Sequence, residues 1–416
     1  CSYWDYDFTN RDKKMTEQEA QEETLRLIKK AIERQLVADV PVGSYLSGGM
    51  DSASIVAIAS KQIPHISTFT CGFDMSEVTG REVNFDERRE AELIASHFKT
   101  EHYEQVIGVN AIERVLPGVI YHLEDLRLGM SYPNYYIARL ASKFVKVCLS
   151  GGGGDELYGG YPWRYYRSFR SFDQQAFFDK YYKEWQRLIL DEEKPQFFTG
   201  ETWHNITDRD TKEILSRVFT FNKTLKYDTP EDHIANSLYF EIKTFMHGLF
   251  VLQDKLSMAH GLEERVPLLD NDLVDFAQRI PIRHKLKNLK KMKRLDEGFL
   301  HKEALYFKDT NDGKNCLRNA MRTILPTNII NRPKQGFSSP DESWYRGEGI
   351  SYVKKVLYDK KAVYSEFIEQ SAVDKILEEH CSGKANHRLL IWSLLCFEWW
   401  CHIFLLGESE HARHIV

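Results

Sequence analysis

Two short glycine-rich runs contain the residues of this sequence that are best suited to binding a phosphorylated ligand. The first, SGGMDS (residues 47–52), follows an apolar segment and leads into an alanine-rich run. Its two glycines let the backbone turn with its amides pointing inward, and amides at the start of a helix bind anions. Ser47 and Ser52 add hydroxyl donors, whereas Asp51 would repel a bare phosphate and therefore indicates a shared divalent cation, Mg²⁺. The run predicts a magnesium polyphosphate site, with a purely structural tight turn as the alternative.

The second run, SGGGGDE (residues 150–156), follows another strand-like segment. Its successive glycines cost chain entropy, and a close approach of the backbone to a ligand is one compensation. Ligands of doubly wound sheets lie at the carboxyl ends of the strands, so Asp155 is expected to complete the magnesium shell opposite Asp51. Neither run has the lysine of a G-x-x-x-x-G-K-[ST] loop, and a dinucleotide fingerprint is lacking. Two such runs at neighbouring strand ends favour a ligand site over plain loops.

Alternating strand-like and helix-like segments surround these runs and indicate a parallel sheet with covered faces. Strands are predicted at 40–47, 65–73, 102–107 and 144–150, the first and last of them buried, and helices at 52–60, 86–98 and 132–142. Asp86 is the expected cap of the helix that ends at Phe98. Thr16 and Glu19 fit a capping box for a first helix that ends near Ala38. From about Tyr161 onward the pattern is helical and rich in aromatic residues, with few strand candidates.

The predicted fold class is therefore α/β: a parallel, doubly wound sheet with a large helical C-terminal portion. Residues 1–38 would form a linker and the first helix, 39–160 the α/β core, and 161–416 a helical portion of the same unit, because no linker-like stretch separates the last two. Within that portion, Glu264 and Arg265 are interpreted as a structural ion pair on a buried turn.

Composition narrows the function classes. The net charge of −5 gives no general reason to expect nucleic acid or an anionic membrane as partner. The seven cysteines are odd in number and form no C-x-x-C pair, which argues against a disulfide framework or a zinc site and favours a reducing, cytoplasmic location. The most apolar stretch, Leu389–Leu406, contains Glu398 and His402, so it predicts a buried C-terminal helix rather than a membrane span.

Several motifs together resemble the synthetase domain of glutamine-dependent asparagine synthetases and of the related β-lactam synthetases. SGGMDS is followed further along the chain by SGGGGDELYGGY, which is similar to the family pattern S-G-x-G-x-D-E-L-x-G-G-Y. Two later blocks, DKLSMAHGLEERVPLLD (254–270) and KNCLRNAMRTILPTNIINRPKQGFSSP (314–340), also resemble family segments. The resemblance runs from about residue 3 to the C-terminal helix. It implies an α/β core of the ATP-pyrophosphatase type.

The resemblance implies an enzyme that uses ATP and Mg²⁺ and splits ATP between its α- and β-phosphates. A carboxylate attacks the α-phosphorus to give an acyl-adenylate and pyrophosphate, and an amine then displaces AMP. Carried over position by position, the residues expected to hold pyrophosphate and magnesium are Ser47, Gly48, Gly49, Asp51, Ser52, Asp155 and Lys334. Leu46 and Cys71 would present backbone groups to adenine, and Ser150 and Gly151 would line the nucleoside. Asp51 and Lys334 are the expected catalytic residues, because the charge that develops on leaving pyrophosphate must be neutralised.

The sequence departs from the family beside the reacting centre. The family's second loop usually reads S-G-E-G, and Gly152 stands at the position of that glutamate. Losing a carboxylate that manages the protons of the amine would cost about a hundred-fold in rate unless another group replaced it. The possible replacements, which the sequence does not rank, are Glu124, Asp125, Glu156, Tyr158 and Tyr161. Arg127 lies in the run expected to face the acceptor (123–136), where it would pair with a substrate carboxylate or lie on the surface.

The family's complete enzymes begin with a cysteine-initiated glutaminase domain, whereas the match here begins around YWDYDF (residues 3–8). Ammonia would therefore come from glutamine through a glutaminase domain or subunit, or from elsewhere. Aspartate is the default acceptor, which would place the protein in asparagine biosynthesis, with a homodimer as one possible assembly. A sugar uronate or other carboxylate is the first alternative, and a non-catalytic ATP-binding homologue is the second. A tRNA-modifying enzyme would want a basic surface and paired cysteines, which this sequence does not offer.

Overall fold

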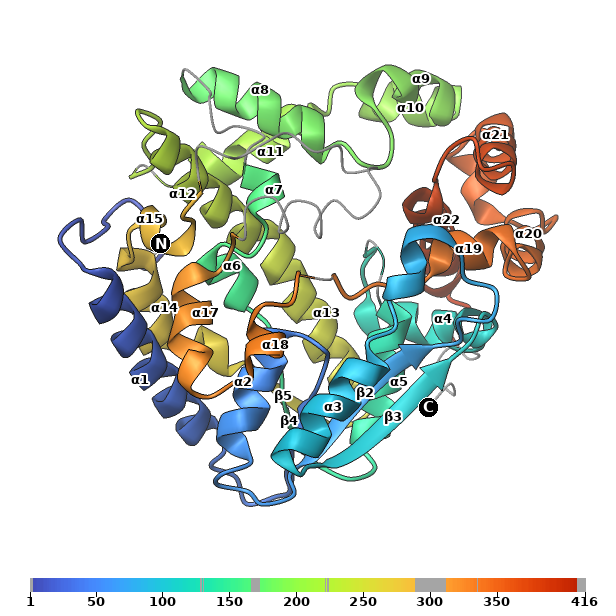
Figure 1. The fold of residues 1–416 in the computed structure, drawn as a ribbon. Coiled ribbons are helices and arrows are strands. Elements are labelled where there is room, and N and C mark those ends of the chain that lie inside the picture. Colours follow the sequence, from blue (N-terminus) through green and yellow to red (C-terminus); the bar gives the residue numbers. More distant parts are fainter. Residues whose placement is uncertain are drawn as a thin grey trace.

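The computed structural model describes residues 3–127, 129, 131–165, 173–220, 222, 224–288, 312–334 and 336–409. A five-stranded parallel sheet in the order β3-β2-β1-β4-β5 organises it (Figure 1). The strands are β1 (Val42–Tyr45), β2 (Ser67–Phe73), β3 (Glu101–Ile107), β4 (Val147–Leu149) and β5 (Glu263–Arg265). The four strands predicted from the sequence and the α/β class are confirmed.

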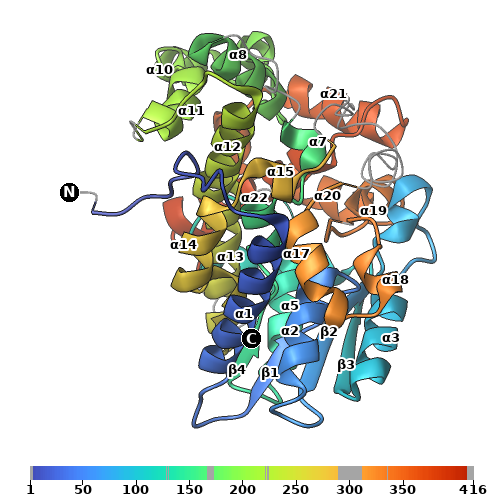
Figure 2. The same cartoon turned by 60° about the vertical axis from the view of Figure 1, so that its left-hand side comes forward.

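Helices make up most of the remaining described chain (Figures 1 and 2). The first half contains α1 (Glu17–Gln35), α2 (Met50–Ala59), η1 (Gly80–Asn84), α3 (Arg88–Phe98), α4 (Ala111–Leu123), α5 (Ser131–Ala141), α6 (Gly154–Tyr158), α7 (Pro162–Tyr165), α8 (Gln174–Trp185), η2 (Asp191–Glu193), α9 (Lys194–Phe197) and α10 (Gly200–Ile206). The second half contains α11 (Thr211–Thr220), α12 (Pro230–Glu241), the π-helical η3 (Ile242–Met246), α13 (His247–Met258), η4 (Pro267–Leu269), α14 (Asn271–Arg279), α15 (Ile282–Lys285), α17 (Asn315–Ala320), η6 (Met321–Thr323), α18 (Thr327–Ile330), α19 (Asp341–Arg346), α20 (Ile350–Leu357), η7 (Val363–Glu366), α21 (Gln370–Cys381), α22 (Arg388–Trp400) and the π-helical η8 (Cys401–Leu405).

Each face of the sheet has its own hydrophobic core. On one face, Val42, Val147 and Leu149 belong to a cluster with the apolar sides of α1, α2 and α3. On the other face, Phe69 and Cys148 belong to a cluster with α4, α5 and the C-terminal helices. Strands that are buried on both faces read as nearly continuous apolar runs, which is why the sequence revealed them.

Two local predictions have different outcomes. The capping box of α1 is confirmed, because Thr16 and Glu19 exchange side-chain-to-backbone hydrogen bonds. The Asp86 cap is wrong by one residue: α3 begins at Arg88 with Glu87 in the capping position. Asp86 still accepts a long hydrogen bond of 3.4 Å from the Arg88 backbone amide, and it forms an ion pair with the Arg88 guanidinium at 2.7 Å.

The short strand β5 was missed by the sequence prediction and lies within the segment expected to be helical. It pairs in parallel with β4, with Cys148 opposite Glu264. The expected ion pair between Glu264 and Arg265 is also wrong. Consecutive residues of a strand point to opposite faces, and Arg265 contacts the carboxylate of Glu263 at 2.7 Å and donates to the carbonyl of Gln35.

The C-terminal apolar segment packs into the protein. By length and composition, Arg388–Leu405 is the one helix in the described ranges that could cross a membrane, and half of it is buried. Leu390, Leu394 and Leu395 lie in the core next to α4 and α20. Glu398 is 2% exposed and accepts hydrogen bonds from the backbone of Val363. The predicted burial of this helix is confirmed.

Candidate active site

The two glycine-rich runs lie side by side because β1 and β4 are neighbours in a parallel sheet. A Cβ atom added to Gly151 would lie 2.8 Å from the backbone nitrogen of Ser52, and one added to Gly154 would lie 2.9 Å from the Asp51 carboxyl carbon. Distances this short exclude any side chain at either glycine without rearrangement. The prediction that both runs meet at one sheet edge is therefore confirmed, and the close approach explains two of the glycines.

Serine hydroxyls hold the first loop in shape. Gly49 caps the N-terminus of α2, and its amide donates to Ser47 Oγ at 3.1 Å. The amide of Ser47 donates to Ser52 Oγ, also at 3.1 Å. Arg332 donates to the Gly48 carbonyl at 3.0 Å and so fixes the outer side of the turn. The hydroxyls expected to meet phosphate thus have internal partners that order the amides of this loop.

Four charged side chains meet where the loops touch. The Lys314 ammonium lies 2.8 Å from both Asp51 Oδ2 and Asp155 Oδ1, and the Lys334 ammonium lies 2.9 Å from Asp155 Oδ2. The side chains of Asp51, Asp155 and Lys314 are only 12%, 7% and 8% exposed. Lys334 was predicted from the resemblance, whereas Lys314 was missed. The available signal was its place at the start of the 314–340 block, directly after Gly313.

Burial and charge act in opposite directions on the two carboxyls. Burial disfavours the charged form of Asp155, but the ammonium groups of Lys314 and Lys334 outweigh it and hold the pKa of that carboxyl below its ordinary value. Burial raises the pKa of Asp51, which has Lys314 as its close cation and Asp155 as a repelling neighbour. The pKa of Lys334 is raised because Asp155 and Asp51 outweigh its burial.

The donor set fits Mg²⁺ bound together with phosphates. Asp51 Oδ1 is buried and has no hydrogen-bond partner within the described chain, so a carboxylate oxygen remains for a cation. The described residues contain no cluster of three or more His, Cys, Asp or Glu side chains that would hold a metal alone. Mg²⁺ commonly binds through one or two carboxylates and takes its other ligands from substrate phosphates and water. The pair Asp51 and Asp155 matches that pattern.

All of the residues predicted to form the site line one cavity of about 1300 Å³. They are Leu46, Ser47, Gly48, Gly49, Asp51, Ser52, Cys71, Arg127, Ser150, Gly151, Asp155, Glu156, Tyr161 and Lys334. At Leu46, which was predicted to present its backbone to adenine, the amide already donates to the Phe69 carbonyl at 2.9 Å, and the carbonyl accepts from Thr70. Only the second lone pair of that carbonyl is therefore open to a ligand. The individual roles of these residues remain predictions.

The structure separates the residues considered as replacements for a carboxylate at Gly152. Glu156 lines the cavity and accepts a hydrogen bond from the Tyr161 hydroxyl at 3.0 Å. Burial, reinforced by Asp155, raises the pKa of Glu156 to about 7. Tyr158 points instead to Thr24 at 3.5 Å. The two remaining candidates, Glu124 and Asp125, are exposed, and Glu124 pairs with Lys255.

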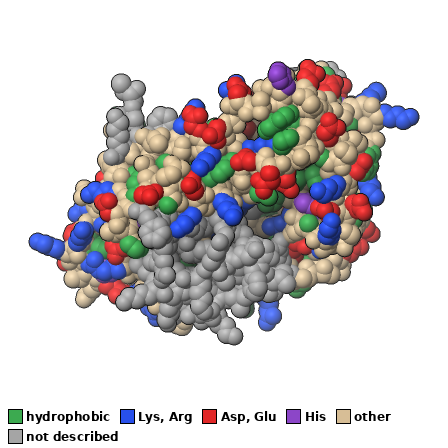
Figure 3. Space-filling model, turned by 90° about the horizontal axis from the view of Figure 1, so that it is seen from above, with side chains coloured by type: hydrophobic (Ala, Val, Ile, Leu, Met, Phe, Trp, Pro, Cys, Tyr) green, Lys and Arg blue, Asp and Glu red, His purple; other side chains and the backbone are tan. Residues whose placement is uncertain are grey.

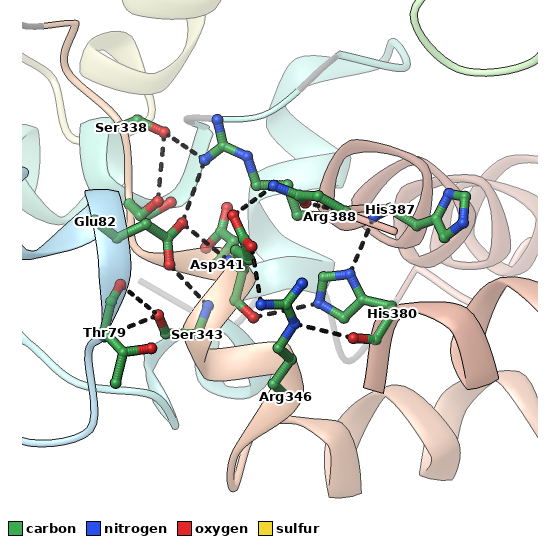
Figure 4. Close-up of polar contacts among 12 residues, drawn as sticks. Thr79, Glu82, Ser338, Asp341, Ser343, Arg346, His380, His387 and Arg388 are labelled. Atoms are coloured by element: carbon green, nitrogen blue, oxygen red, sulfur yellow. Dashed lines mark hydrogen bonds and ion pairs between the residues drawn. The ribbon is translucent and has the colours of Figure 1, made fainter. Parts of the chain in front are cut away.

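A buried polar network lies behind one wall of the cavity, on the side of the C-terminal helices (Figure 4). Two of its members, Asp341 and Arg388, line the cavity themselves. Glu82, which is 1% exposed, accepts from the Ser343 amide at 2.7 Å and lies 3.5 Å from the Arg388 guanidinium. Asp341 accepts from the Tyr132 hydroxyl at 2.7 Å. The network joins η1 to α19 and α22, so it holds this wall against the α/β layer.

Comparisons with known proteins agree with the class that this fold and site define, an α/β protein with a ligand site at the carboxyl edge of a parallel sheet. The family model for asparagine synthase matches residues 23–402, and the chain belongs to that family. It is 30% identical over 392 residues to asparagine synthetase [glutamine-hydrolyzing] 1 of Bacillus subtilis, covering 87% of this chain and 56% of that protein. It is 28% identical over 421 residues to a putative asparagine synthetase [glutamine-hydrolyzing] of Mycobacterium tuberculosis, covering 94% and 58%. The chain thus spans little more than half the length of these relatives.

Proposed function

We propose that this chain is the synthetase part of an ATP-dependent, AMP-forming amide ligase of the asparagine synthetase type. The observation that carries the proposal is the contact between the two loops, which brings Asp51, Asp155, Lys314 and Lys334 together in one cavity. Two carboxylates suit a divalent cation, and two ammonium groups beside them suit the phosphates that it would bind. The chain would form one unit in three parts: a linker and first helix (1–38), the ATP-pyrophosphatase core (39–160) and a helical portion (161–416).

In this mechanism the chain binds the triphosphate and stabilises the leaving pyrophosphate. Asp51 and Asp155 would hold Mg²⁺, which when bound supplies positive charge that neutralises the departing phosphates. The loop amides at the start of α2 would bind phosphate oxygens. Lys334 and Lys314 would move from the carboxylates toward the phosphates as the cation takes their place. The acceptor carboxylate then attacks the α-phosphorus, and the amine displaces AMP from the acyl-adenylate.

The default amine source and acceptor acid are those expected for the asparagine synthase family. The names of the relatives include glutamine hydrolysis, so ammonia would be released from glutamine by a glutaminase domain or subunit and would convert aspartate to asparagine. Glu156, held by Tyr161, is the carboxylate best placed to take the role of the missing glutamate. Such an enzyme would work in the cytoplasm, with a homodimer as the proposed assembly.

A second candidate function has the same adenylate-forming chemistry but a different acceptor acid. Gly152 replaces the family glutamate, and its surroundings favour an acid other than aspartate, such as a sugar uronate or another carboxylate. A non-catalytic ATP-binding homologue is less well supported, because the carboxylates and the lysines of the site are all present. The acid that supports AMP formation distinguishes aspartate from another acceptor, and no AMP formation with any acid would favour the non-catalytic homologue.

The test is acid-dependent formation of AMP and pyrophosphate from ATP, Mg²⁺ and ammonium, with aspartate and a panel of other carboxylic acids. The proposal predicts that Asp51→Asn and Lys334→Ala abolish AMP formation, because each removes a charge from the phosphate site. Matched controls are Asp208→Asn and Lys360→Ala, which change exposed side chains outside the cavity. ADP as the product, or unchanged turnover in the two site variants, would contradict the proposal.

A further inference from the structure

The acceptor end of the cavity differs in character from the phosphate end. Beyond Gly152, η3 and α13 line the cavity mostly with apolar side chains, namely Phe245, Met246, Leu249, Phe250 and Leu252, together with the polar Gln253. The phosphate end is lined instead by the two aspartates and the two lysines. A ligand that spans both ends would therefore place a charged portion and an apolar portion in different environments.

Phe250 occupies the space that a side chain at residue 152 would need. A Cβ atom on Gly152 would lie 2.6 Å from Cε1 and 2.8 Å from Cζ of the Phe250 ring. The ring is half-buried and also lines the cavity, so one part covers the glycine backbone and another part faces the ligand space. Glycine at 152 and phenylalanine at 250 thus form a matched pair that makes this part of the floor aromatic. Its polar neighbour is Gln253 Oε1, which lies 3.9 Å from the same Cβ position and is buried with no hydrogen-bond partner among the described residues.

Arg127, a cation of this end, forms no ion pair with a carboxylate of the described residues. The Arg127 guanidinium lies against Gly248 on α13, where an added Cβ would be 2.0 Å from Nη1. Within the described part of the chain, its guanidinium makes one long hydrogen bond of 3.4 Å, from Nη2 to the Phe245 carbonyl, and Nε is buried with no partner. Burial lowers the pKa of Arg127, opposed only by Asp125. A guanidinium keeps its charge in proteins, so an anion from the ligand would compensate it.

We propose that this end of the cavity selects an acceptor acid with an apolar body that packs on Phe250 and a second anionic group that pairs with Arg127. This inference rests on the proposed adenylate-forming function and names the substrate class of the same site. Aspartate supplies the second carboxylate but offers the Phe250 ring an ammonium group in place of an apolar surface. A planar or apolar substituent at that position gains contact with the ring instead.

The test uses unreactive mimics of the acyl-adenylate, 5′-O-(N-acylsulfamoyl)adenosines, in which a sulfamate replaces the phosphate. The acyl groups form a two-by-two set: butanoyl, succinyl, 3-phenylbutanoyl and phenylsuccinyl differ only by a second carboxylate and a phenyl ring. A β-aspartyl mimic carries an ammonium group in place of the ring. Calorimetry measures the dissociation constant of each mimic with the complete chain, so no turnover is required.

The inference predicts that phenylsuccinyl binds tightest, ahead of β-aspartyl. The carboxylate should improve binding about ten- to a hundred-fold, as expected for a charge-assisted pair, and the ring should improve it about ten-fold. Arg127→Gln should remove only the gain from the carboxylate, and Phe250→Ala only the gain from the ring, with Phe250→Leu intermediate. Arg209→Gln, an exposed substitution outside the cavity, should change neither ratio.

The ratio of the dissociation constants of two mimics, measured on the same variant, is insensitive to a general loss of affinity. A partly destabilised variant therefore still tests the inference. Tightest binding of the β-aspartyl mimic, or a succinyl-to-butanoyl ratio unchanged in Arg127→Gln, would overturn the inference while leaving the adenylate site in place. Failure of every mimic to bind would instead contradict the proposed function itself.

Discussion

Replacing Lys314 with methionine tests how the charged cluster is held together. Methionine keeps most of the length and volume of the side chain and removes only the ammonium group, which lies 2.8 Å from Asp51 Oδ2 and Asp155 Oδ1. These side chains are between 7% and 12% exposed, so water replaces little of the lost interaction. Breaking a buried ion pair by removing one partner costs about 3–5 kcal/mol. Lys334 still contacts Asp155 at 2.9 Å, so we expect a loss near 3 kcal/mol.

The assay is urea-induced unfolding at neutral pH, followed by tryptophan fluorescence with and without Mg²⁺. Since Mg²⁺ would neutralise the same two carboxylates, it should stabilise Lys314→Met more than the parent protein. The double variant Asp51→Asn/Lys314→Met should lose less than the sum of the single variants, because the pair acts as a unit. A free energy of unfolding for Lys314→Met within about 0.5 kcal/mol of the parent would refute the reasoning.

Two further predictions concern the loop contact and the edge strand. Gly154→Ala places a Cβ 2.9 Å from the Asp51 carboxyl carbon, so it should weaken Mg²⁺-dependent ATP binding, which calorimetry measures. The control is Gly200→Ala, because a Cβ there meets nothing within 4 Å. Equal ATP affinities of the two variants would contradict the functional importance of the loop contact. Burial raises the pKa of Glu264 to about 7, so the folded protein binds more protons than the unfolded chain between about pH 4.5 and 7. Glu264 should therefore remove up to about 3 kcal/mol of stability as pH rises through that range, and Glu264→Gln should lack that part of the loss. Glu156, whose pKa is also raised to about 7, contributes equally to both proteins, so the test is the difference between their stability curves. Parallel curves would contradict this.

The extent to which the fold could be predicted depended on how each strand is buried. β1, β2 and β4 are covered on both faces, so their residues form apolar or β-branched runs that indicate strands directly. β5 reads Glu-Glu-Arg and is partly exposed, so neither periodicity nor composition marks it. Its strand conformation comes from pairing with β4, which is a tertiary effect.

The same distinction applies to the site. Ligands lie at the carboxyl ends of parallel strands, so the sequence alone predicted that Asp51 and Asp155 lie close together. Lys314 joins them from a helix start far along the chain, and a single lysine in a sequence carries no mark of its partners. The pairing of Gly152 with Phe250 was equally hidden, because the sequence shows the missing side chain but not the ring that fills its place.

The most direct measurement is a crystal structure of the protein with Mg²⁺ and a non-hydrolysable ATP analogue. The account predicts the triphosphate at the first glycine loop, where the Gly49 amide exchanges its bond to Ser47 Oγ for one to a phosphate oxygen. It also predicts Mg²⁺ bound by Asp51 and Asp155 and both lysines at the phosphates. A triphosphate bound elsewhere, or a metal that neither aspartate touches, would contradict it.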